Sequence, residues 1–160
     1  MASFIKNLIP LALWILIAQG AGLIGSAFTA PAISGWYAAL EKPQVAPPNW
    51  VFAPVWTTLF LLMGVAAYLV WRKPASRGRT LALKLFFAQL ILNVLWSVLF
   101  FGLKSPAMAL AEIALLWLSI AATIWAFSKI SGPAALLLAP YLAWVSFASY
   151  LNFMLWTLNS

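Results

Sequence analysis

The sequence contains neither cysteine nor histidine among its 160 residues. Without cysteine it has no disulfide and no thiolate nucleophile, and without histidine it has no imidazole to act as a general base near neutral pH. The usual nitrogen and sulfur ligands of zinc and haem iron are absent for the same reason. We therefore expect no metal site, no resident cofactor and no ordinary hydrolytic or group-transfer chemistry.

Charge is scarce as well. Only 9 side chains are basic and 2 acidic, so charged residues make up 7% of the chain, against roughly 25% in soluble domains, while 66% of residues are hydrophobic. This composition excludes a soluble globular protein. The net charge of +7 does not indicate nucleic-acid binding, because the basic residues are divided among several short connections, as in loops at a membrane surface.

Five apolar stretches of about twenty residues are present, the length at which an α-helix crosses a hydrocarbon layer ~30 Å thick. A membrane β-barrel would instead show alternating segments of about ten residues. We predict an all-α integral membrane protein, a single domain over residues 1–160. Its transmembrane helices are expected at 8–28, 51–71, 81–103, 107–127 and 133–155, with a longer loop at 29–50.

The predicted loop at 29–50 is stiff and aromatic. Three prolines lie between residues 43 and 48, and Trp36, Tyr37 and Trp50 are amphipathic rings that prefer the headgroup level. The segment is either an interfacial aromatic belt or a lid that covers a ligand at the mouth of the bundle. Rigidity favours a lid, because it lowers the ordering cost of ligand binding.

Polar and aromatic residues fall on one face of three predicted helices. The amides of Gln89 and Asn93 are costly to expose to lipid, so this face should point into the bundle. There the side chains either hydrogen-bond between helices or wall a cavity suited to a large, planar, mostly apolar ligand. The three faces carry Trp56, Phe60 and Met63; Gln89, Asn93, Trp96, Ser97 and Phe100; and Tyr141, Trp144, Ala148, Leu151 and Asn152.

Two further features leave alternatives open. Small residues recur at four-residue spacing, as at Ala18, Gly22 and Ser26, and such rows let helices pack closely within the bundle or, as the alternative, in a homodimer. Glu112 lies about five residues into the fourth helix, roughly 7.5 Å along it at 1.5 Å per residue. Its carboxylate either reaches the interface, is neutral and hydrogen-bonded, or has a functional role.

The order of motifs from about Gly25 to Asn152 resembles the TspO/MBR family, also known as translocator protein, peripheral-type benzodiazepine receptor or tryptophan-rich sensory protein. The chain resembles a bacterial member. The matching motifs are Trp36-Tyr37 with Lys42-Pro43 and Pro47-Pro48, Pro54-Val55-Trp56, Asn93 with Trp96, Phe100-Phe101-Gly102, and Pro140-Tyr141-Leu142-Ala143-Trp144 with Leu151-Asn152.

The resemblance implies a five-helix bundle, commonly dimeric, with a cavity beneath the first loop that accepts porphyrins and isoquinoline carboxamide drugs. Protoporphyrin IX would then be a ligand and not a resident cofactor. Trp56 and Trp144 match tryptophans linked to light-dependent degradation of protoporphyrin in some bacterial relatives, and Glu112 stands where the family usually has an aspartate. The implied ligand-binding residues are Tyr37, Pro47, Phe52, Trp56, Phe60, Asn93, Trp96, Ser97, Trp144 and Ala148.

Two departures from the family pattern limit what is carried over. Val45 replaces a tryptophan common in the family's loop, which removes a stacking ring from that position. The cholesterol-recognition pattern at the end of the last helix needs a tyrosine and then a basic residue. This chain reads Leu151-Asn152-Phe153 with no Lys or Arg after it, so we do not expect sterol binding through that motif.

Three functions are compatible with these residues. The leading hypothesis is a membrane protein that binds porphyrin by aromatic stacking and has a sensory or regulatory role in the tetrapyrrole or stress response. The second is an enzyme in which Trp56 and Trp144 are the catalytic residues of light-dependent protoporphyrin degradation. A carrier of porphyrins or lipids ranks third, because the sequence lacks the inverted repeats of known transporters.

The basic residues also predict an orientation. Seven fall on the side of the N-terminus, while Lys42 and Lys104 fall on the other side. Cytoplasmic loops are enriched in Lys and Arg, so we predict a multi-pass protein of the bacterial cell membrane with a cytoplasmic N-terminus. A C-terminal reporter that is active only in the cytoplasm should stay silent, and strong reporter activity would contradict this orientation.

Overall fold

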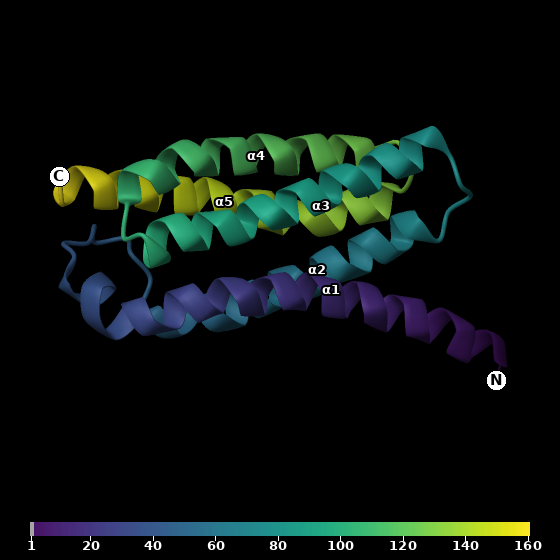
Figure 1. Cartoon of the computed structure of the whole chain (residues 1–160). Helices are drawn as coiled ribbons and strands as arrows, with labels where there is room; N and C mark the ends of the chain where they lie inside the picture. The colour runs from purple at the N-terminus through teal and green to yellow at the C-terminus, as the bar shows by residue number, and fades with distance from the viewer. Residues whose placement is uncertain (1) are drawn as a thin grey trace.

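The structure is a computed structural model that describes the backbone of residues 2–160 and the side chains from residue 7 onward. Five long helices run back and forth along one axis within this range (Figure 1). They are α1 (Ala2–Ala32), α2 (Phe52–Trp71), α3 (Arg77–Ser97), α4 (Pro106–Ser128) and α5 (Gly132–Leu158). Each helix is long and apolar enough to cross a membrane, which confirms the predicted all-α bundle of five transmembrane helices.

Three short elements modify the ends of these helices. The π-helix η1 (Ile33–Tyr37) continues α1, the π-helix η3 (Val98–Gly102) continues α3, and the 3₁₀ turn η2 (Asn49–Val51) leads into α2. In η3 the wide turn is closed by a hydrogen bond of 2.8 Å from the Leu103 N–H to the Val98 carbonyl. Single π turns are frequent at functional sites.

The first helix is longer than the sequence indicated. We predicted its end at residue 28, but helical backbone continues through Pro31 and Gly35 to residue 39. The predicted loop at 29–50 is therefore reduced to residues 40–48 followed by η2. Pro31 and Gly35 are poor helix formers, but Ala32 and Tyr37 are buried, so the packing of this segment outweighs its weak helix propensity.

The helices are arranged as two groups. Helix α4 packs against both α3 and α5, while α1 packs against α2 and α3, and α2 also contacts α5. The purple N-terminus and the yellow C-terminus lie at opposite ends of the bundle (Figure 1). Residues 40–48 and the α3–α4 connection lie at the end that holds the C-terminus, which we call the loop end.

Serine residues begin three of the helices. Ser76, Ser105 and Ser131 each accept a hydrogen bond from the backbone N–H three residues later, at 3.0, 3.3 and 3.4 Å. These bonds satisfy N–H groups that have no partner inside the helix. Prolines in the first turns of α4 and α5 fit there because a missing N–H has no consequence at that position.

The core includes many residues of the polar and aromatic faces predicted from the sequence, among them Gln89 and Met63. Gln89 is 1% exposed, and its amide Nε2 donates a weak hydrogen bond of 3.8 Å to the sulfur of Met63, which is fully buried. Phe86 and Phe127 stack nearby in the same cluster, with ring centres 6.1 Å apart. Gln89 and Met63 therefore serve packing between α2 and α3.

Gly64 lets α2 lie directly against the backbone of α1. A Cβ atom placed on Gly64 would lie 2.5 Å from the Cα of Ile15 and 2.9 Å from the carbonyl oxygen of Trp14, which is closer than such atoms can come. The atoms that it would meet belong to the backbone and cannot rotate away. This contact between the two helices therefore requires glycine.

Gly64→Ala should force α1 and α2 apart and destabilise the bundle by about 1 to 3 kcal/mol, the usual cost of overpacking. Gly20→Ala on α1 is the matched control, because a Cβ at Gly20 meets nothing within 4 Å. Thermal unfolding in detergent, followed by circular dichroism, should show a lower midpoint for the first variant only. Equal midpoints would mean that this contact does not hold the helices together.

Candidate functional site

A cavity of about 400 Å³ lies between α1, α2, α3 and α5 near the loop end of the bundle. Its volume falls within the range of small-molecule sites, about 300 to 1,000 Å³. Among the described residues, the lining contains aromatic rings, small side chains and a few amides and hydroxyls, but no Lys, Arg, Asp or Glu. Such a lining suits an apolar ligand with few hydrogen-bonding groups.

Residues predicted from distant parts of the sequence meet in this cavity. Pro47 does not line the cavity, and neither does any other residue from 38 to 48. The lining includes the two residues that flank this segment, Tyr37 and Asn49. That the lining residues contact a ligand stays a prediction. Nine of the ten predicted residues line the cavity: Tyr37, Phe52, Trp56, Phe60, Asn93, Trp96, Ser97, Trp144 and Ala148.

Trp56 and Trp144 come from α2 and α5 and line the same cavity. The ring of Trp56 lies 5.6 Å from that of Phe60, and the ring of Trp144 lies 6.2 Å from that of Phe52. In the part of the chain that the structure describes, neither indole N–H donates a hydrogen bond, whereas the indole of Trp96 donates to Asn152. The indole N–H groups of Trp56 and Trp144 are therefore available to a ligand.

The amides of the wall also bond between helices. The Asn93 Nδ2 donates to the Tyr141 hydroxyl at 2.9 Å, and both side chains are buried. The Trp96 Nε1 donates to the Asn152 Oδ1 at 3.0 Å, and the Asn152 Nδ2 donates to the Pro106 carbonyl at 2.8 Å. Asn93 and Asn152 thus both hold helices together and line the cavity, so the two interpretations drawn from the sequence apply together.

The contribution of α1 to the wall was not predicted. The sequence showed a row of small residues on this helix. Small residues occur both where helices pack together and where a helix lines a cavity, so their size alone does not tell the two apart. A Cβ on Gly22 would lie 2.7 Å from the Phe60 ring, and one on Gly25 would lie 3.1 Å from the Ser97 hydroxyl, so both glycines make room for wall residues. The first helix and η1 contribute Gln19, Gly22, Leu23, Gly25, Ser26, Thr29, Ala30 and Ile33.

Aromatic packing closes the cavity toward the loop end. Tyr37 and Phe100, from η1 and η3, are 4% and 1% exposed and belong to one cluster with Leu155. The ring of Trp96 stacks on Phe100 at 5.0 Å, and the ring of Phe101 lies 5.7 Å from Tyr37. Both π turns therefore place rings across the end of the bundle.

The connection that follows η1 is fastened to the last helix. The Glu41 N–H donates to the Asn159 Oδ1 at 2.9 Å, and the Asn159 Nδ2 donates back to the Glu41 carbonyl at 3.0 Å. The Lys42 ammonium donates to the carbonyl of Leu40 at 3.0 Å and lies 4.7 Å from the centre of the Tyr37 ring. These contacts hold residues 40–42 in place above the aromatic cluster.

Glu112 is 6% exposed, and neither oxygen of its carboxylate has a hydrogen-bond partner among the described residues. Its burial does not favour the alternative in which the carboxylate reaches the interface, and the neutral and the functional alternatives both stay predictions. Glu112 does not line the cavity.

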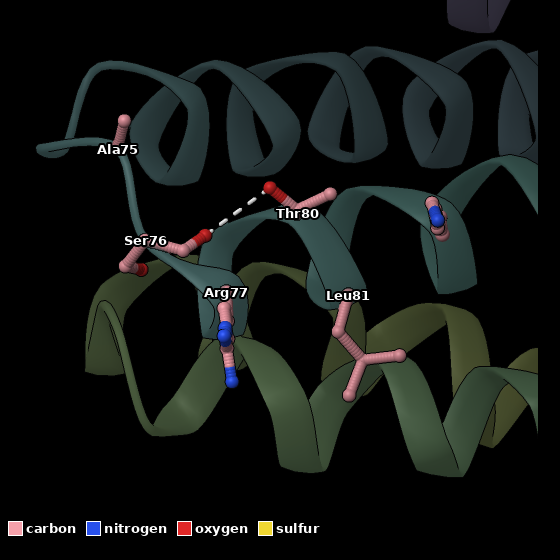
Figure 2. A pocket seen from close by; sticks show the side chains of 6 residues that line it. Ala75, Ser76, Arg77, Thr80 and Leu81 are labelled. Carbon is pink, nitrogen blue, oxygen red and sulfur yellow. Dashed lines mark hydrogen bonds between the residues drawn. The ribbon is translucent and has the colours of Figure 1, made fainter.

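A second hollow, of about 510 Å³, lies at the opposite end of the bundle (Figure 2). Although it is larger, its lining comes from a single stretch of chain, Ala75 to Lys84, and most of these side chains are exposed. The Thr80 hydroxyl is already used in a hydrogen bond of 3.1 Å to the Ser76 carbonyl. A hollow with one wall encloses no ligand, so we place the site in the four-helix cavity.

The fold and the cavity define a multi-pass α-helical membrane protein with an uncharged, aromatic cavity near one end of its bundle. Comparison with known proteins shows to which family this bundle belongs. The sequence profile of the TspO/MBR family matches residues 8–157. The chain belongs to the TspO/MBR family.

Similar proteins occur in bacteria and in animals. The chain is 47% identical over 158 residues to the tryptophan-rich protein TspO of Chlorobaculum tepidum, with 96% of this chain and 98% of that protein covered. It is 43% identical over 137 residues to the tryptophan-rich sensory protein of Cereibacter sphaeroides, with 81% and 85% covered. It is 41% identical over 138 residues to the translocator protein of Homo sapiens, with 85% and 82% covered.

Asn93→Leu removes both an amide from the cavity wall and the hydrogen bond to Tyr141. We expect the affinity for the planar probe protoporphyrin IX to fall about 5-fold or more, which corresponds to roughly 1 kcal/mol for one hydrogen bond. Asn7→Leu is the matched control, because Asn7 is an exposed amide that does not line the cavity. Tryptophan fluorescence quenching measures both affinities, and equal values would mean that α3 does not form the binding wall.

Proposed function

We propose that the protein binds protoporphyrin IX, or a similar planar apolar ligand, in the four-helix cavity and has a sensory or regulatory role in the tetrapyrrole or stress response. The observation that carries the proposal is that Trp56 and Trp144, from two helices, line one uncharged cavity. Stacked aromatic groups contribute about 0.5 to 1.5 kcal/mol beyond the burial of their area. A planar macrocycle is the class of ligand that uses both rings.

The uncharged lining and the nearby ammonium of Lys42 together suit a macrocycle that has an apolar face and acidic substituents at its edge. The cavity itself offers no cation, so its lining suits the apolar face of the ring. The Lys42 ammonium lies 4.7 Å from the ring centre of Tyr37, which lines the cavity. The carboxylates of a porphyrin would therefore lie toward this loop end, where the membrane interface also begins.

The relatives support the same proposal in a general way. One of them is named a tryptophan-rich sensory protein, which supports the sensory role. Isoquinoline carboxamide drugs are flat, apolar and uncharged, so the same cavity suits them. We further propose that the protein lies in a bacterial cell membrane, surrounded by membrane lipid, with its N-terminus in the cytoplasm. We propose a homodimer as its assembly. We do not propose sterol binding through the C-terminal motif.

The same two tryptophans favour a second function, light-dependent degradation of the bound porphyrin. Indole is much more easily oxidised than the phenyl ring of phenylalanine, and two indoles line the cavity in which the porphyrin would lie. The described lining holds no carboxylate, ammonium or imidazole that would support acid–base chemistry instead. Illumination of the complex therefore separates a binding protein from an enzyme.

Trp56→Ala and Trp144→Ala should each weaken protoporphyrin binding, because each removes one of the two indole rings on which the macrocycle would stack. We expect a loss of about 1 to 3 kcal/mol, or about 5-fold to 150-fold in affinity. Trp→Phe at either position should cost much less, because a flat ring remains. Quenching of tryptophan fluorescence in detergent, first in the dark and then under light, measures binding and any loss of the porphyrin absorption band in one sample.

Trp125→Ala is the matched control for these variants. Trp125 is 61% exposed on α4 and does not line the cavity, so its loss should leave the affinity unchanged. If the protein is an enzyme, Trp56→Phe or Trp144→Phe should retain binding but slow the light-dependent loss of porphyrin. Unchanged affinity in both alanine variants, with helicity intact, would show that these rings only pack the bundle.

A further inference from the structure

One side of the cavity is made of residues that are also on the surface of the bundle. Leu23 lines the cavity although 71% of it is exposed, and Ser26 and Ala30 on α1 line it and are exposed as well. Opposite them, Ala53 and Thr57 on α2 share both properties. The cavity therefore reaches the molecular surface along the seam between α1 and α2, which run side by side in Figure 1.

Away from the loop end, the seam between α1 and α2 is closed. The Gln19 Nε2 donates a hydrogen bond of 2.9 Å from α1 to the Thr57 carbonyl on α2, and Gly64 rests on the backbone of Ile15 two turns further along α2. Beyond the Gln19–Thr57 bond, toward the loop end, the exposed lining side chains other than Leu23 are small. The opening thus ends at the Gln19–Thr57 hydrogen bond and is flanked by Ser26 and Ala53.

The seam lies within the depth of the membrane-spanning helices. The second span begins at Asn49, and Ala53 and Thr57 follow about 6 and 12 Å along it at 1.5 Å per residue. The first span extends from Asn7 to Tyr37 and includes Ser26 and Ala30. Helices of this length cross a hydrocarbon layer, so we expect lipid chains rather than water to face the opening.

A route into the cavity through the loop end is more obstructed than the opening between α1 and α2. Tyr37, Phe100 and Leu155 fill that end and are each less than 5% exposed. The connection above them is fastened through the paired hydrogen bonds between Glu41 and Asn159. A ligand that came from water would have to displace this cluster and break these bonds, whereas a ligand from the side has to pass only the exposed side chains of the seam, of which Leu23 is the largest.

We propose that the cavity exchanges its ligand sideways with the lipid phase, through an opening between α1 and α2 that is flanked by Ser26 and Ala53. The proposal rests on the proposed ligand site and specifies the class of ligand. Molecules that partition into hydrocarbon and present a flat, uncharged edge can pass, whereas water-soluble molecules of the same size are kept out by the aromatic cluster. The loop end serves to retain the ligand and is not its entrance.

Bulky residues at the seam should slow exchange. Ser26→Phe and Ala53→Phe narrow the opening, and Ala27→Phe is the matched control, because Ala27 neighbours Ser26 and is exposed but does not line the cavity. In lipid nanodiscs, stopped-flow quenching by protoporphyrin IX should show association and dissociation both slowed at least about tenfold in the seam variants. Ala27→Phe should match the parent protein.

A second measurement does not depend on porphyrin binding. The chain has no cysteine, so Ala148→Cys introduces a single thiol on the cavity wall. A membrane-soluble pyrene maleimide should label this thiol faster than a charged maleimide of similar size, and adding Ser26→Phe should slow the labelling by the membrane-soluble reagent. Adding Ala27→Phe should have no such effect.

The outcomes separate this proposal from the proposed function. Absence of quenching by protoporphyrin, with labelling that still depends on Ser26, would overturn the ligand but support the lateral opening. Equal rates for Ser26→Phe, Ala53→Phe and Ala27→Phe in both measurements would overturn the opening. Faster porphyrin association in Asn159→Ala, which unfastens the loop, would also overturn it, because the loop end would then be the entrance.

Discussion

The cavity depends on an unequal spacing between α1 and α2 along their length. Away from the loop end, Gly64 places α2 against the backbone of Ile15, and no side chain separates the two helices there. Toward the loop end, the rings of Phe60 and Trp56 stand on α2, and Gly22 on α1 leaves room for the first of them. Because backbone contact fixes the helices at one level and aromatic rings hold them apart at the next, a space remains that side chains do not fill.

The opposite walls are held by hydrogen bonds. Within a hydrocarbon layer water does not compete for polar groups, so a bond between helices fixes their relative position. Asn93 on α3 bonds to Tyr141 on α5, and Asn152 on α5 joins Trp96 on α3 to the first turn of α4. These bonds set the spacing of the helices that carry Trp96 and Trp144, so the polar groups of the bundle determine the width of an otherwise aromatic site.

Much of this arrangement could be predicted from the sequence, because bilayer thickness fixes the length of a spanning helix and helical periodicity puts Trp56 and Asn93 on inward faces. The continuation of helical backbone beyond α1 to residue 39 could not be predicted, since it depends on the burial of Tyr37 by residues far along the chain. The wall formed by α1 was missed for a related reason. A glycine such as Gly22 has the same appearance in a sequence whether it faces a helix or a space, and only the position of Phe60 decides between them.

The central claim is that a planar ligand lies in the four-helix cavity between Trp56 and Trp144. An experimental structure of the protein with protoporphyrin IX bound, determined in lipid, tests it most directly. We predict a macrocycle within van der Waals contact of both indole rings, about 3.5 to 4.0 Å between heavy atoms. A macrocycle in the hollow at the α2–α3 connection or on the lipid-facing surface, with the four-helix cavity filled by protein side chains, would contradict the account.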